Sequence, residues 1–447
     1  MNDLIAALLF SFTLLLLSAI QGYFILYPLL LTAVVLTGVF LRRGFALQSL
    51  LKMAIQGSHK AVSVLKILLL VGILTATWMA SGTVPAIVYY GIQLISPHWF
   101  ILAAFILTSF VSLLLGTSFG AASTVGIALM IMARGSDVNP DWIAGAVIAG
   151  AYFGDRCSPM SSSAHLVAAI TQTDLYLNLR WMIVTGLIPL LVSSGLYGLL
   201  SFLHPVQTAE TILPSELHRL FALNPVVLLP ALVLMALALL RVDVKHSMLA
   251  SIGAGAVIAV GVQHYSWLQV CRFALLGFEL DEATPIQSIL LGGGLLSMAK
   301  VCLVVVVSTA IAGLLAETQA LRLIEDQLAQ LRSRHQLFLG TTVVGIASAA
   351  FGCTQTIAIL LTQQLMQQKY RQEGLSDELA IDLENTVVVL APLIPWNIAG
   401  LVPATILMTD AGFIPYACYL YLLPLCSWLI FYRQKSDREY SKKTLFS

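Results

Sequence analysis

An acid, a base and a run of hydroxyls stand together in residues 150–167, GAYFGDRCSPMSSSAHLV, directly behind an apolar run. In a chain this hydrophobic we expect Asp155, Arg156 and His165 to lie at or near membrane depth. Each would cost roughly 2.5–3.5 kcal/mol there unless it has a polar partner or water. Because a bilayer protein keeps such groups mainly where something polar binds or passes, this segment is the first candidate for a functional site.

The proline in this segment adds to its chemistry. Pro159 has no backbone donor and frees the carbonyl of Asp155, whose carboxylate is itself a cation ligand. Arg156 is suited to neutralise that carboxylate or to bind a substrate carboxylate, although sequence neighbours point to different faces of a helix. His165 can take up a proton near neutral pH or make a structural hydrogen bond. The hydroxyls that follow Arg156 are those of Ser158, Ser161, Ser162 and Ser163.

A plainer interpretation of the same segment is a helix end. Asp155 and Arg156 would then meet water at the membrane surface, and the serines would cap the next helix. Residues 164–170 are apolar again, which favours a broken or re-entrant helix instead.

A second polar stretch, GTSFGAASTVG (116–126), is rich in glycine. Glycines weaken a helix and let backbone carbonyls turn away from their usual partners. Freed carbonyls, with the hydroxyls of Thr117 and Ser118, are hard oxygen ligands of the type that suits an alkali cation. Helix packing through small residues is the alternative interpretation of this stretch.

The second half of the chain carries two comparable segments, FGCTQT (351–356) and ENTVVVLAPLIPWN (384–397). The latter enters the membrane from Glu384 and is interrupted by two prolines, which leaves the Asn397 amide beside unpaired backbone. Glu384 is also well placed as an acid at a helix N-terminus, where the macrodipole favours it. The candidates here are Thr354, Gln355, Glu384, Asn385, Trp396 and Asn397.

The elements that must position these residues are membrane helices. The chain has 447 residues, 59% hydrophobic and only 10% charged, against about 25% charged for a soluble domain. Its apolar runs are continuous and do not alternate, which excludes a barrel and predicts an all-α polytopic membrane protein with about 11–13 membrane segments. The six cysteines are scattered singly and favour packing roles. No basic patch indicates nucleic acid, and membrane lipid is the expected surrounding.

Charge distribution predicts the orientation. The 42–60 connection and the C-terminal tail are basic, which places both termini in the cytoplasm, whereas the acidic 264–286 connection is expected outside. Residues 47–60 are expected to lie on the cytoplasmic face. The expected divisions are N-terminal helices and a cytoplasmic connection (1–60), a first transport repeat (61–203), connecting and scaffold helices (204–286), a second transport repeat (287–434) and a tail (435–447).

Internal similarity suggests that the two halves are related. SFGAASTVGIAL (118–129) aligns with AFGCTQTIAIL (350–360) over ten residues without a gap, so that Gly120 falls on Gly352 at an offset of 232. At an offset of 233, Pro159 falls on Pro392. Paired interruptions predict two inverted-topology repeats with broken or re-entrant helices meeting at a binding site. Chance similarity between apolar segments is the alternative.

The chain resembles the NhaC family of bacterial sodium–proton antiporters. The resemblance is carried by GTSFG…STVGIALM (116–130), GAYFGDRCSPMS (150–161), TDLYLNLRWM (173–182), GGGLLSM (292–298), LENT (383–386), PLIPWN (392–397) and PYACYLYLLPL (415–425). It implies two inverted repeats in a bacterial plasma membrane, with helix breaks near the midplane where sodium binds and exchanges for protons or drives another solute.

The chain departs from the usual family pattern at two places. Where family members typically have SDTTN, this chain has SSSAH, so that Ser162 replaces a carboxylate and His165 an amide. Asn385 likewise replaces an aspartate. Two lost carboxylates leave Asp155, Glu384 and His165 as the groups that can alternate between cation and proton.

These observations favour sodium–proton antiport with Na⁺ as coupling ion and no cofactor. The predicted cation ligands are Asp155, Thr117, Ser118, Ser158, Thr354 and Asn397. The predicted proton or substrate ligands are Arg156, Ser161, Ser162, Ser163, His165, Gln355, Glu384, Asn385 and Trp396. The alternative is sodium-coupled symport or exchange of an amino acid or small carboxylate. An intramembrane enzyme is disfavoured because GxSxG and HExxH motifs are absent. The sequence leaves open whether the protein forms a homodimer.

Overall fold

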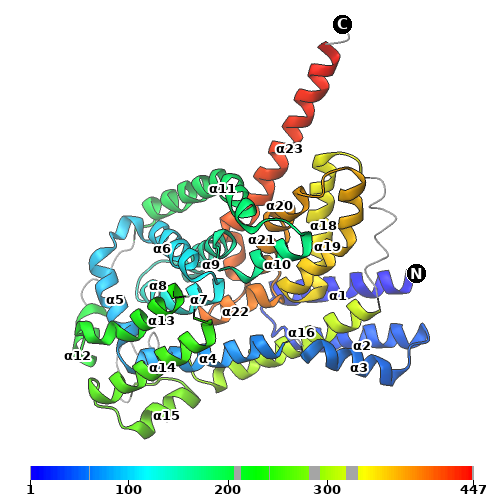
Figure 1. The fold of residues 1–447 in the computed structure, drawn as a ribbon. Helices are drawn as coiled ribbons and strands as arrows, with labels where there is room; N and C mark the ends of the chain where they lie inside the picture. Colours follow the sequence, from blue (N-terminus) through cyan, green and yellow to red (C-terminus); the bar gives the residue numbers. More distant parts are fainter. Residues whose placement is uncertain are drawn as a thin grey trace.

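The computed structural model describes residues 2–59, 61–205, 213–240, 242–280, 292–318 and 331–444. The regular elements in these ranges are helices, and an isolated bridge joins Phe278 and Gly292. The helices form one body from which the end of the last helix projects (Figure 1). The predicted all-α polytopic class is therefore confirmed. The predicted external connection, 264–286, lies partly outside the described residues.

The first half of the chain builds the elements from the N-terminus to the long helix α11. They are α1 (Asn2–Ile20), α2 (Leu26–Arg42), α3 (Leu47–His59), α4 (Val62–Ala80), α5 (Thr83–Leu94), η1 (Pro97–Trp99), α6 (Phe100–Leu115), α7 (Ser118–Ala121), the π-helical η2 (Ala122–Gly126), α8 (Ile127–Arg134), α9 (Pro140–Cys157), α10 (Ser162–Thr171) and α11 (Leu175–Leu203).

The connecting region and the second half supply the remaining elements. They are α12 (Leu213–Leu220), η3 (Pro225–Leu228), α13 (Leu229–Leu239), α14 (Val244–Gly261), α15 (Trp267–Leu276), η4 (Leu296–Met298), α16 (Ala299–Glu317), α18 (Arg334–Gly352), α19 (Gln355–Gln372), α20 (Glu378–Asn385), α21 (Val387–Leu390), η6 (Ala391–Leu393), α22 (Ile398–Ile406), η7 (Ala411–Tyr416) and α23 (Cys418–Thr444).

Within the described residues, four helices are long and apolar enough to cross a membrane, or up to seven if each bent pair counts as one span. Six further apolar helices are shorter, with 10–17 residues, so the described residues include apolar segments too short to meet this length criterion on their own. Helix α11 is the longest span, and side chains such as Leu187 and Leu191 are half or more exposed along it. An apolar surface of this kind is expected to face lipid.

The N-terminal helices pack against α16. In Figure 1, α1, α2 and α3 lie beside α16 on one side of the body. The approach of α3 to α16 is close, because a β-carbon on Gly57 would lie 2.4 Å from the carbonyl oxygen of Thr309 and 2.8 Å from the α-carbon of Gly313. Only glycine at this crossing lets the two backbones meet. Residues 47–59, which we expected at the cytoplasmic surface, therefore have one side covered by protein.

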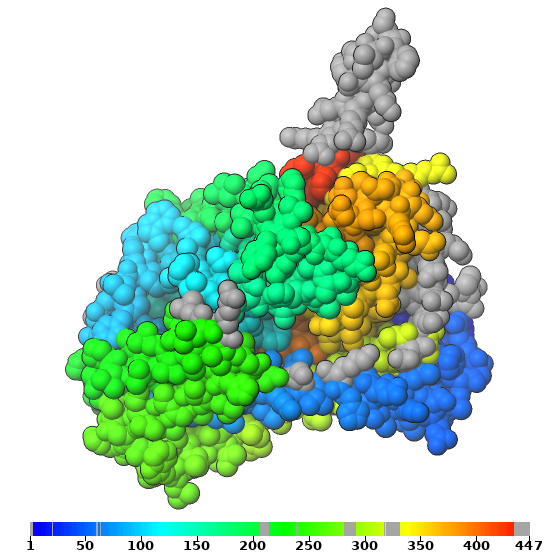
Figure 2. All heavy atoms as spheres, viewed as in Figure 1, coloured from blue at the N-terminus to red at the C-terminus, as the bar shows by residue number. Residues whose placement is uncertain are grey.

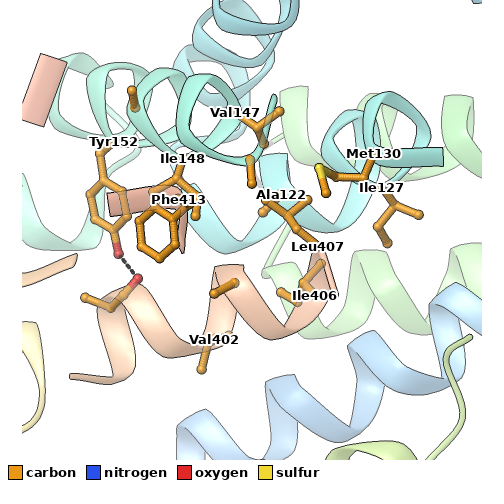
Figure 3. Packing of buried hydrophobic residues seen from close by; sticks show 14 of the residues in the cluster. Ala122, Ile127, Met130, Val147, Ile148, Tyr152, Val402, Ile406, Leu407 and Phe413 are labelled. Atoms are coloured by element: carbon orange, nitrogen blue, oxygen red, sulfur yellow. Dashed lines mark hydrogen bonds between the residues drawn. The ribbon is translucent and has the colours of Figure 1, made fainter. Parts of the chain in front are cut away.

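The helices of the two halves meet in a common apolar core. Figure 3 shows Ala122 and Met130 from the η2–α8 segment, Val147 from α9 and Leu407 beyond the end of α22 packed together. Elsewhere, α10 touches α19 and α20, and the Gln363 side chain donates to the Ile170 carbonyl at 3.2 Å. In Figure 2 the residues of α10 and α19 form one continuous surface. Breaks in one half are therefore held against helices of the other.

Candidate functional site

The first helix break lies between α6 and α7. Gly116 adopts a left-handed conformation with φ 65°, and Thr117 is extended and accepts a hydrogen bond from the Gly120 amide at 3.4 Å. A β-carbon on Gly116 would lie 2.4 Å from the β-carbon of Met160 and 2.7 Å from its carbonyl carbon. Met160 belongs to the second break, between α9 and α10. The two breaks of the first half are thus in direct contact, and glycine is required where they touch.

Asp155 lies in the last turn of α9, beside the first break. Its side chain is buried, and the backbone amide of Ser118 donates to Oδ2 at 3.2 Å. The other carboxylate oxygen, Oδ1, is buried without a hydrogen-bond partner. The first helix break and the Asp155 carboxylate are therefore joined by a hydrogen bond, and one carboxylate oxygen is left without a partner.

Arg156 is fully buried, and its guanidinium donates hydrogen bonds to neutral acceptors. Nε donates to the backbone oxygen of Glu384 at 3.2 Å. Nη1 donates to the Met182 carbonyl and the Tyr419 hydroxyl, at 2.9 and 3.2 Å. Nη2 donates to the Thr185 hydroxyl at 3.1 Å and to the Asn385 amide oxygen. Each of the five N–H groups thus has an acceptor, and none of these acceptors is a carboxylate.

Glu384 is the second carboxylate of this region with unpaired oxygen atoms. Its side chain is fully buried, and both carboxylate oxygens lack a hydrogen-bond partner. It interacts electrostatically with Arg156 and with Asp155. Thr386, two residues further on, ends the helix with φ −124° and ψ −78°. Glu384 therefore lies within α20 rather than at its N-terminus, so a macrodipole role does not explain it.

Asn385 anchors Arg156 to the second half. Its Oδ1 accepts from Arg156 and from the Thr185 hydroxyl at 3.2 Å, while Nδ2 donates to the Ser427 hydroxyl at 3.3 Å. All its polar atoms are used, which indicates a positioning role.

The second half has its own break between α18 and α19. Cys353 is left-handed with φ 54°, and Thr354 accepts from the Ile357 amide at 3.1 Å. Carbonyls in the last turn of α18 accept hydrogen bonds from the segment between η6 and α22. Trp396 Nε1 donates to the Ala350 carbonyl at 2.6 Å, and Asn397 Nδ2 donates to the Ala349 carbonyl at 2.7 Å. Their polar groups cap α18, so these two side chains have a structural task here.

The remaining candidates make local contacts. The hydroxyls of Ser161 and Ser163 lie 2.9 Å apart, and Ser158 accepts from the Met160 amide at 3.2 Å. Gln355 donates to the Val388 carbonyl at 2.8 Å. Ser162 and His165, which stand where the family pattern differs, are exposed on α10. His165 Nε2 lies 3.1 Å from the Pro159 carbonyl, which fits the structural hydrogen bond that was one of its two interpretations.

The break positions correct the register of the internal match. Gly120 lies after the first-half break, whereas Gly352 ends α18 before the second-half break. Matching conformations instead pair the helix-capping threonines Thr117 and Thr354, at an offset of 237. By this criterion the ten-residue alignment is wrong by five residues. It paired Gly120 with Gly352, but glycine occurs both at helix breaks and at close helix contacts, so a shared glycine does not fix the register. The inverted-repeat relation stays a prediction.

Residues 150–432 match the model of the Na⁺/H⁺ antiporter family. The chain belongs to this family. It is 30% identical over 421 residues to the Na⁺/H⁺ antiporter NhaC of Bacillus subtilis, covering 91% of this chain and 92% of that protein. It is 30% identical to an uncharacterised Na⁺/H⁺ antiporter of Haemophilus influenzae, covering 87% and 86%. It is 28% identical to the malate-2H⁺/Na⁺-lactate antiporter of Bacillus subtilis, covering 84% and 82%.

For this member of the Na⁺/H⁺ antiporter family, several site residues were missing from the sequence expectations. Thr185, Met182 and Tyr419 hold the Arg156 guanidinium, and Ser427 holds Asn385. Met182 and Tyr419 fall in the segments TDLYLNLRWM and PYACYLYLLPL, which carried the family resemblance. That resemblance was the one signal that pointed to them.

Proposed function

We propose that this multi-pass membrane protein exchanges sodium for protons, and that Asp155 and Glu384 are the carboxylates for which the two cations compete. Three oxygens carry the proposal: Asp155 Oδ1 and both carboxylate oxygens of Glu384 are buried without a hydrogen-bond partner. Burying ionised carboxylates in this way is costly, so the pair needs a bound cation or proton in addition to the nearby Arg156.

Sodium is expected to bind at Asp155 Oδ1, where the first-half breaks meet. Thr117, Ser118 and Ser158 lie on the segments that contact Asp155, and their hydroxyl or carbonyl oxygens are suitable further ligands. The side chains of Thr354 and Asn397 cap α19 and α22, so we assign them a supporting role rather than that of direct ligands. Arg156 and Asn385 hold the two halves in place around the carboxylates.

Alternating access follows from the packing of each broken helix against the other half. A cation or proton bound between the halves is exposed to one side and then the other as one set of helices rocks. We place the protein in a bacterial plasma membrane with both termini in the cytoplasm, because the 42–60 connection and the tail are basic.

A second candidate is sodium-coupled exchange of a small carboxylate or amino acid. The similarity to a malate-2H⁺/Na⁺-lactate antiporter favours it. Against it, the guanidinium best suited to a substrate carboxylate has all five N–H groups occupied. We therefore rank sodium–proton exchange first.

The test is flux in proteoliposomes that contain the purified protein and an internal pH dye. An outward-directed sodium gradient is expected to acidify the lumen only in the presence of protein. Lithium and potassium gradients measure ion selectivity. Uptake of labelled malate or lactate driven by sodium, without a sodium-dependent pH change, would replace the first proposal by the second.

A further inference from the structure

Among the described residues, the buried acidic side chains do not each have a basic side chain to neutralise them. Four Asp, Glu, Lys or Arg side chains are buried in these ranges: Asp155, Arg156, Asp382 and Glu384. Asp382 is neutralised separately, because Arg334 contacts both of its carboxylate oxygens. Two carboxylates and one guanidinium are left, and they interact electrostatically.

The guanidinium of Arg156 keeps its full charge in this group. Arginine is always protonated in proteins, and its acceptors here are carbonyls, hydroxyls and the amide oxygen of Asn385. Asn385 therefore supplies a hydrogen bond without supplying a negative charge. With Asp155 and Glu384 ionised, the group as a whole carries one negative charge.

We propose that Arg156, whose charge its neutral partner Asn385 does not compensate, limits the site to one monovalent cation and makes the exchange one sodium for one proton without net charge movement. The inference rests on the proposed sodium–proton exchange. With sodium bound, both carboxylates are ionised and the sum is zero. With a proton bound, one carboxylate is neutral and the sum is again zero. Buried net charge is costly, so these two neutral forms are the ones that cross.

The wild-type protein tests the charge balance directly. Proteoliposomes are clamped at several potentials with potassium and valinomycin, and the pH gradient that stops sodium-driven proton flux is measured. A tenfold sodium gradient is expected to be balanced by about one pH unit at every potential. A balance point that moves with potential overturns the inference while leaving sodium–proton exchange in place. Absence of sodium-dependent proton flux overturns the proposed function itself.

Asn385→Asp tests the residue that sets the charge. A carboxylate at this position would pair with Arg156 and leave two uncompensated charges at Asp155 and Glu384. Sodium-dependent thermal stabilisation is then expected to change from a Hill coefficient of about one toward about two. Asn178→Asp is the control, because Asn178 is buried on α11 and its side chain donates to Thr173 rather than contacting Arg156. Sodium binding that stays non-cooperative in Asn385→Asp contradicts the role of Asn385, and the voltage measurement decides the ratio even if that variant does not fold.

Discussion

Gly116 and Met160 hold two helix breaks together at a distance that only glycine permits. A β-carbon on Gly116 would lie 2.4 Å from the β-carbon of Met160, and Gly116 has the positive φ of 65° that glycine tolerates best. The contact joins the α6–α7 break to the α9–α10 break, and the Ser118 amide on one side binds Asp155 on the other. The position of the Asp155 carboxylate relative to the Ser118 amide thus depends on the contact between Gly116 and Met160.

Gly116→Ala is expected to destabilise the protein by roughly 1–3 kcal/mol, because the added methyl overpacks a backbone contact and the φ value is strained. It should also weaken sodium-dependent stabilisation by displacing Ser118 from Asp155. Thermal unfolding in detergent with and without sodium measures both effects. Gly253→Ala in α14 is the control, since nothing lies within 4 Å of its β-position. Equal unfolding temperatures for the two variants would contradict the packing argument.

Asp155→Asn is expected to lower sodium-driven proton flux at least about tenfold, because the amide has no negative charge for sodium or proton. The fold should survive, since the Ser118 amide can still donate to the amide oxygen. Proteoliposome flux at equal protein density measures the loss. Asp174→Asn is the matched control, because Asp174 caps α11 at an exposed position and asparagine caps equally well. Normal flux in Asp155→Asn would remove this carboxylate from the mechanism.

Glu384→Gln is expected to separate function from stability. In sodium-free buffer the variant should unfold at the same or a higher temperature, because the wild-type carboxylate is buried without a partner. Sodium-driven proton flux should nevertheless fall at least about tenfold, since a cation-binding charge is lost. Glu378→Gln, in the first turn of the same helix, controls for a charge change on α20. A strongly destabilised Glu384→Gln with normal flux would indicate a structural carboxylate instead.

Asp382→Ala is expected to destabilise the protein by about 3 kcal/mol, because it leaves the partly buried Arg334 and the buried Tyr370 hydroxyl without their shared acceptor. Adding Arg334→Met should recover part of the loss, since the second change removes the unpaired cation. A double-mutant cycle by thermal unfolding checks this coupling. Additive effects of the two changes would show that the ion pair contributes nothing of its own.

Sequence patterns identified the fold class and the polar residues, because membrane helices require long apolar runs and an intramembrane charge is rare. They did not identify hydrogen-bond partners. The acceptors of Arg156 lie in three segments that are far apart in the chain, at 182–185, at 384–385 and at Tyr419. Arg156 therefore looked available for a substrate, although its donors are occupied. Trp396 and Asn397 likewise looked like ligands, although they cap a helix end.

The capping of α18 by the 396–398 segment also limits how the molecule can move. Trp396 and Asn397 donate to the last carbonyls of α18, and the Ile398 amide donates to the Cys353 carbonyl at 2.9 Å. Sliding α22 away from α18 would break three hydrogen bonds at once. Across the α9–α22 contact, by comparison, Tyr152 makes a side-chain hydrogen bond to the Ala399 carbonyl at 2.7 Å amid apolar packing (Figure 3). If one set of helices rocks as proposed, we therefore expect α18 and α22 to move together as a rigid unit, with the relative motion at the mainly apolar α9–α22 contact.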